Sequence, residues 1–141
     1  MESMAFSAAG QLDAQWYLDT AAQRHIVDSR CHSVNYTQYE KPTKFCKGIG
    51  NKQLPIIGHG DIEVVTRTGN KTHKATIADA YHCPGLGTNL LSFSQLKKKN
   101  KMAITEKGFS VTGAKGVPMY FNEHNGMYPL EGAILSETAQ R

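Results

Sequence analysis

The feature that most constrains this chain is a short apolar segment that ends on an acid. Residues 16–22 read Trp-Tyr-Leu-Asp-Thr-Ala-Ala. Three bulky residues in succession predict a buried strand, and a carboxylate at its end loses hydration that only hydrogen bonds or a partner can replace. Asp19 therefore either accepts backbone N–H groups in the following turn, as Asp often does, or carries out chemistry.

Length and composition limit the remaining choices. A chain of 141 residues fits one domain. With 40% hydrophobic residues, 20% charged residues and 13 glycines, it is expected to be globular and rich in turns. No apolar run approaches the roughly 20 residues that cross a bilayer, and the first residues lack a basic and then apolar signal. We therefore expect an intracellular, cytoplasmic protein without membrane partners.

The cysteines and histidines do not form a recognisable metal or disulfide pattern. Three cysteines, Cys31, Cys46 and Cys83, are odd in number and widely spaced, which favours reduced thiols. No Cys-x2-Cys or His-x3-His pair occurs, so we predict no metal site and no cofactor. A Cys–His nucleophile pair stays open as an alternative, but no spacing in the sequence supports one.

The formal net charge of +4 is modest, and much of it lies in Lys97, Lys98, Lys99 and Lys101. These lysines are not interleaved with aromatic residues, and no nucleic-acid-binding motif is visible. A solvated helix face explains the cluster, so nucleic acid is an unlikely partner.

Most of the chain after residue 45 reads as strands separated by glycine-containing turns. Hairpin turns are expected at 48–52, at 69–70 and at 106–108. Residues 23–35 show no alternation and are expected to form a surface loop, with room for one helical turn. One short helix is expected from the spacing of Leu90, Phe93 and Leu96, with Thr88 or Asn89 as its N-cap and Asn100 at its end.

A second glycine pattern lies at residues 58–60, where Gly58 and Gly60 flank His59 inside an otherwise strand-like run. Such a backbone can bend over a ligand, or it can form a plain β-bulge.

Three segments, in order, resemble one family. Asp-Thr-Ala-Ala at 19–22 is similar to the Asp-Ser/Thr-Gly-Ala/Ser signature of retropepsins, the aspartic proteases of retroviruses and retrotransposons. Leu-Pro-Ile-Ile-Gly-His-Gly-Asp-Ile-Glu-Val at 54–64 resembles the apolar, Gly-x-Gly, apolar pattern of the copia-type branch. Leu-Gly-Thr-Asn-Leu-Leu at 86–91 is similar to the family's string that leads into its one helix.

The resemblance implies an all-β, retropepsin-like acid protease fold, a closed β-sandwich or barrel with a glycine-containing flap hairpin and one short α-helix, assembled as a homodimer. It divides the chain into a leader or N-terminal edge strand (1–14), a protease domain (15–124) and a C-terminal strand or linker toward a pre-integrase region (125–141). Its implied partners are a second copy and a peptide or polyprotein substrate.

The same resemblance assigns roles to individual residues. Asp19, Thr20 and Ala21 would form the catalytic loop, and Asp19 would meet its twin across a twofold axis. Substrate would be bound by Ala22, Ile57, Gly58, His59, Gly60 and Leu86. Dimer or structural support would come from Gly87, Thr88 and Asn89.

Ala21 departs from the family signature, which has glycine at that position. Its Cβ excludes backbone conformations with positive φ and places a methyl group near the carboxylates. The alternative function is therefore a degenerate or domesticated binding module of the same fold, with little or no proteolysis.

Overall fold

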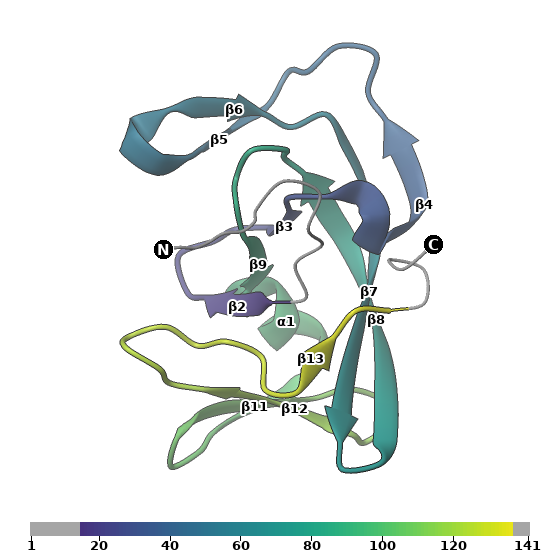
Figure 1. The fold of residues 1–141 in the computed structure, drawn as a ribbon, viewed down its shortest axis with the longest axis vertical. Helices are drawn as coiled ribbons and strands as arrows, with labels where there is room; N and C mark the ends of the chain where they lie inside the picture. The colour runs from purple at the N-terminus through teal and green to yellow at the C-terminus, as the bar shows by residue number, and fades with distance from the viewer. Residues whose placement is uncertain (1–14, 137–141) are drawn as a thin grey trace.

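The computed structural model describes residues 15–136, and most of its regular secondary structure is strand (Figure 1). The strands are β2 (Trp16–Asp19), β3 (His25–Val27), β4 (Ser33–Gln38), β5 (Phe45–Lys47), β6 (Gln53–Pro55), β7 (Gly58–Thr68), β8 (Lys71–His82), β9 (Asn89–Ser92), β10 (Lys101–Ile104), β11 (Gly108–Thr112), β12 (Pro118–Asn122) and β13 (Ala133–Ile134). The described part contains one α-helix, α1 (Phe93–Lys99), and the 3₁₀ turns η1 (Arg30–His32) and η2 (Ile49–Asn51). The predicted all-β fold class with one short helix is confirmed.

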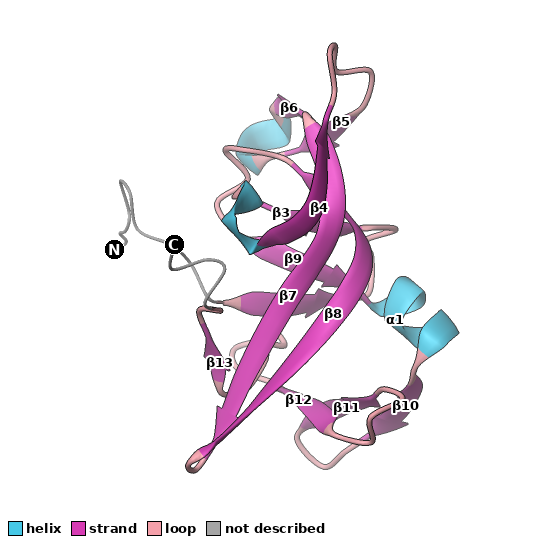
Figure 2. Ribbon diagram, turned by 90° about the vertical axis from the view of Figure 1, so that its right-hand side faces the viewer, coloured by secondary structure: helices cyan, strands magenta, loops and turns pink. Residues whose placement is uncertain are grey.

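The β7–β8 hairpin contains the two longest strands and runs along the length of the molecule (Figure 2). It turns at Gly69, where φ is +61° and glycine is favoured, as the sequence predicts. The main sheet runs in the order β13-β7-β8-β3-β9-β2, and β4 also pairs with β7. Two of these pairs, β2 with β9 and β3 with β8, are parallel, so segments distant in sequence lie side by side.

A single hydrophobic core joins the main sheet to the smaller sheet β10-β11-β12. Its largest fully buried side chains include Trp16 from β2, Ile62 from β7, Leu91 from β9 and Phe121 from β12. Phe109 stacks edge-to-face against both Phe93 and Tyr128, with ring centroids 5.4 and 5.2 Å apart. Burial of these aromatic and branched side chains is the main favourable term in the folding of the domain.

The helix begins later than predicted. Residues 89–92 form strand β9, and Ser92 is the N-cap, because its Oγ accepts a hydrogen bond from the backbone N–H of Gln95 at 3.2 Å. Pairing with β2 holds Asn89 in a strand, so neither Thr88 nor Asn89 caps the helix. The predicted end is confirmed, since the N–H of Asn100 closes the last turn on Leu96.

The expectation of a surface loop over residues 23–35 is wrong, although the helical turn considered there is present as η1. This segment contains β3, η1 and the start of β4, and both His25 and His32 are buried. A three-residue strand between two neighbours is too short to show a period in the sequence. Its burial comes from pairing with β8 and β9.

The expectation of three reduced thiols is also wrong. Cys46 of β5 and Cys83, which follows β8, form a disulfide across 37 residues of sequence, and Cys31 is free. The fold brings the β5–β6 hairpin against the end of β8, a proximity that cysteine spacing alone cannot indicate.

The C-terminal residues that the structure describes pack into the same core. Leu130 donates its N–H to the carbonyl of Trp16 at 2.7 Å, Leu18 donates to Tyr128 at 2.9 Å, and β13 pairs with β7. The division predicted at residues 124–125 therefore does not coincide with a structural boundary, while the segment 1–14 lies outside the described residues. Within residues 15–136, no helix has the length and apolar character needed to span a membrane.

Candidate functional site

Asp19 ends the buried strand β2 and starts an exposed loop. Leu18, one residue earlier, is buried, whereas Asp19 is half-buried and Thr20 and Ala21 are exposed. The Oδ1 atom of Asp19 accepts the backbone N–H of Ala21 at 2.8 Å. The turn interaction considered from the sequence is therefore present, and it uses one carboxylate oxygen. This hydrogen bond also orients the Asp19 carboxylate.

Hydrogen bonds from the N-terminal end of α1 hold the loop after Asp19. The hydroxyl of Ser92 donates to the carbonyl of Ala22 at 2.7 Å, and the side-chain amide of Gln95 donates to the carbonyl of Gln23 at 3.0 Å. In turn, the backbone N–H of Ser92 donates to Nδ1 of buried His25 at 2.9 Å. These bonds fix the backbone of the loop and leave Thr20 and Ala21 facing outward.

The backbone at Ala21 suits alanine. Among the described residues, the non-glycine positions with positive φ are Asn35, Asn51, Asp79 and Asn125. Ala21 is not one of them, so its Cβ meets no left-handed backbone strain here.

Strand β9 supports Asp19 directly, since it lies parallel to β2 with Asp19 opposite Ser92. Asn89 of β9 is 1% exposed, accepts the N–H of Asp28 through Oδ1 at 3.0 Å and donates to the carbonyl of Gln15 at 3.1 Å. The structural part of the role predicted for Asn89 fits this arrangement. Its role in a dimer stays a prediction.

Asp28 is a residue that the sequence analysis missed. Its Oδ1 accepts the backbone N–H groups of Gly85 and Gly87 at 2.9 and 3.1 Å. Both glycines have positive φ, +93° and +82°, so they allow the loop to fold around this carboxylate. Asp28 thereby positions half-buried Leu86, and an acid just after a short strand was the signal available. Thr88 makes no described side-chain hydrogen bond, although its Oγ1 is buried.

Residues 58–60, expected to lie in a glycine-containing flap hairpin, are part of a paired strand in the structure. Gly58 and Gly60 are buried inside β7, which pairs with β4 on one side and β8 on the other. A Cβ on Gly58 would lie 2.2 Å from the hydroxyl oxygen of Tyr36. The absence of a side chain at these glycines leaves space for the neighbouring strand β4. The register shift between Gly60 and Ile62 is the β-bulge that the sequence analysis gave as an alternative.

The side chains and backbone around this segment are also engaged within the sheet. His59 shares a hydrogen bond with the hydroxyl of Tyr39 at 2.7 Å, and Ile57 donates its N–H to the carbonyl of His82 at 2.9 Å. Substrate binding by Ile57 to Gly60 stays a prediction that this pairing does not favour.

The hairpin that projects from the molecule is instead β5–β6, a separate two-stranded sheet. It extends beyond the main sheet, on the side of the view where the loop after β2 also lies (Figure 1). Gly48 donates its N–H to the carbonyl of Lys52 at 2.7 Å to close its turn, and Gly50 has a φ of +73°. Phe45 on this hairpin is 53% exposed.

Burial lowers the pKa values of two histidines near these elements. Desolvation, with a smaller contribution from Lys99, lowers the pKa of His25 to about 4, against the weaker opposing effect of Asp79. Burial also lowers the pKa of His82, which shares a hydrogen bond with Tyr36 at 2.8 Å. Both histidines brace strands, which the sequence did not reveal.

Comparison with curated proteins finds no significant match. Residues 16–101 match the family described as Pol polyprotein, beta-barrel domain. This span contains the Asp19 loop, both long strands and α1, and it covers more than half of the chain. The chain therefore belongs to the family of Pol polyprotein beta-barrel domains.

Proposed function

We propose that this Pol polyprotein domain is a retropepsin-like, copia-type aspartic endopeptidase that acts as a homodimer and processes a retrotransposon polyprotein. The observation that carries the proposal is the Asp19 loop: a half-buried carboxylate at the end of a buried strand, oriented by the N–H of Ala21 and followed by a braced, exposed loop. Hydrogen bonds from Ser92 and Gln95 hold the backbone of the loop that follows this carboxylate.

The chain contributes one Asp-Thr-Ala segment, and aspartic proteolysis requires two carboxylates. A twofold dimer would place Asp19 beside Asp19 of a second copy. Two carboxylates so close cannot both ionise, as the aspartic-protease dyad illustrates in general, so the pair shares one proton. One carboxylate removes a proton from water, while the protonated one polarises the scissile carbonyl.

The loop geometry is compatible with this pairing. Thr20 and Ala21 are exposed in the single chain, as residues at a dimer axis must be before association. Thr20 would brace the two loops through its hydroxyl. In this proposal the β5–β6 hairpin, rather than residues 58–60, closes over the peptide, because it forms a sheet of its own that the Cys46–Cys83 disulfide ties to the end of β8.

The central experiment compares Asp19→Asn with Asp79→Asn. Asp79 is exposed, lies on β8 and has a φ of +62°, which asparagine tolerates, so it is a matched control. Cleavage of an unbiased peptide library, read by mass spectrometry, should be abolished by Asp19→Asn and retained by Asp79→Asn. Equal cleavage by both variants would refute the mechanism, and an unchanged melting temperature would show that Asp19→Asn still folds.

The alternative is a binding module that keeps the fold without turnover, and it is favoured by the replacement of the signature glycine by Ala21. Ala21→Gly separates the two functions. A large gain in cleavage would indicate degeneration through the methyl group. An active wild type with little change in the variant would indicate a protease that accepts alanine, as expected where φ is not positive. No cleavage by either protein, together with saturable peptide binding, would favour the module.

A further inference from the structure

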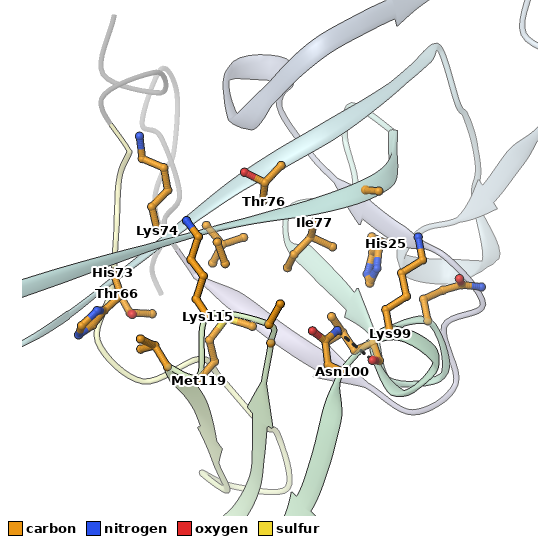
Figure 3. A pocket seen from close by; sticks show the side chains of 18 of the residues that line it. His25, Thr66, His73, Lys74, Thr76, Ile77, Lys99, Asn100, Lys115 and Met119 are labelled. Carbon is orange, nitrogen blue, oxygen red and sulfur yellow. Dashed lines mark hydrogen bonds between the residues drawn. The ribbon is translucent and has the colours of Figure 1, made fainter.

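The proposed proteolysis does not use a cavity of about 660 Å³, although two residues that line it, His25 and Gln95, also take part in the hydrogen bonds that brace the Asp19 loop. Strands β7 and β8, helix α1 and the segment 113–119 surround the cavity (Figure 3). Its volume is in the range of small-molecule sites, which are mostly apolar with a few convergent polar groups.

The cavity has an apolar lining contributed by all of these elements. The aliphatic side chains are Val64 from β7, Ile77 from β8, Leu96 from α1, and Val117 and Met119 from the C-terminal sheet region. Val64, Ile77 and Leu96 belong to the hydrophobic core, so this part of the wall is fixed. Among residues 15–136, no Phe, Tyr or Trp lines the cavity, so this part of the chain gives it no stacking surface of the kind that single-stranded nucleic acid uses.

One end of the cavity is polar and carries two hydrogen-bond donors. His25 is 3% exposed, and its Nδ1 accepts the N–H of Ser92, so a neutral ring carries its hydrogen on Nε2. Within the described residues, no recorded hydrogen bond engages Nε2. Figure 3 shows Lys99 extending beside His25 at this end.

The charge of the lining favours an anion. Among the residues that the structure describes, Lys74, Lys99 and Lys115 line the cavity, together with one acid, Asp79. Lys74 pairs with Glu63 at 3.7 Å, whereas no ion pair recorded among the described residues engages Lys99 or Lys115. The polar end therefore offers an ammonium group and an imidazole N–H beside an aliphatic wall.

We propose that this cavity binds an amphiphilic carboxylate, with its aliphatic chain along Ile77 and Leu96 and its carboxylate at Lys99 and the Nε2–H of His25. The carboxylate would accept one charge-assisted hydrogen bond from Lys99 and one from His25. The aliphatic chain would leave water for a wall that is already apolar.

Decanoate is a suitable probe, titrated into the full chain below its micelle concentration and followed by amide chemical shifts. We expect saturable one-to-one binding, with shifts centred on residues 75–79 and 95–100. Lys99→Gln should weaken binding roughly tenfold, the loss expected when one charge-assisted contact is removed. Decan-1-ol, which has the same chain without the charge, should bind more weakly than decanoate.

Lys98→Gln is the matched control, because Lys98 is exposed on the same helix and does not line the cavity. Its affinity for decanoate should equal that of the unaltered protein. The proposal is overturned if no saturable binding occurs, if Lys98→Gln and Lys99→Gln weaken binding equally, or if decan-1-ol binds as well as decanoate. None of these outcomes depends on whether the domain cleaves peptides.

Discussion

Gly58→Ala tests whether residues 58–60 belong to the sheet or to a moving flap. In the structure, an added Cβ would lie 2.2 Å from the hydroxyl oxygen of Tyr36 and 2.7 Å from the carbonyl oxygen of Thr37. The second atom is backbone of β4, which pairs with β7 at this point, so a side-chain rotation cannot relieve the whole overlap. Either β4 or β7 must move.

Two effects set the expected loss in the free energy of unfolding of Gly58→Ala. Overpacking a fixed site costs about 1–3 kcal/mol. Displacing Tyr36 also breaks its 2.8 Å hydrogen bond with His82, worth about 1 kcal/mol. We therefore expect a loss of about 2–4 kcal/mol in the free energy of unfolding, which for a chain near this size lowers the melting temperature by about 10 °C.

Urea unfolding followed by tryptophan fluorescence measures this loss directly, because Trp16 is buried in the core. Gly113→Ala is the control: the nearest atom to its Cβ would be Oδ1 of the Asn100 side chain at 3.2 Å, which can shift. A Gly58→Ala variant as stable as Gly113→Ala, with altered peptide binding alone, would refute the sheet assignment and restore the flap interpretation.

Three further predictions concern the interactions that hold the site. Cys46→Ser, measured without reductant, should lower the free energy of unfolding by about 4 kcal/mol, because the unfolded chain loses a cross-link that closes a loop of 37 residues. Cys31→Ser, at the free cysteine, should have a much smaller effect. Equal losses in the two variants would contradict the disulfide. His25 has a folded pKa of about 4, below its ordinary 6.5, so its contribution to the free energy of unfolding should be complete above pH 6.5 and fall by up to about 3 kcal/mol as the pH drops to 4. His25→Gln should reduce this pH dependence, measured by urea titrations at several pH values. An unchanged dependence would rule out His25 as its source. Asn89→Ala removes hydrogen bonds to the N–H of Asp28 and the carbonyl of Gln15, so it should cost about 2–4 kcal/mol in thermal unfolding, and a loss below about 0.5 kcal/mol would show that these bonds are not structural.

Several features of the molecule were predictable because they are local. The turns at Gly69 and at 106–108, the strands that flank them and the end of α1 at Asn100 follow from glycine conformation, alternation and capping, which act over a few residues. The apolar run that ends at Asp19 likewise predicted a buried strand, and the structure has β2 there, with Asp19 half-buried at its end.

The tertiary structure alone decided which segments meet. The residues next to Gly58 in sequence do not indicate that the side chain of Tyr36 packs against it. The same Gly-x-Gly pattern would suit a flap or a paired strand. The disulfide joins residues 37 apart, and His25 is buried because β3 lies between β8 and β9. Sequence patterns determine local conformation since backbone and turn preferences are short-ranged, whereas strand pairing and burial depend on contacts between distant residues that only the folded chain brings together.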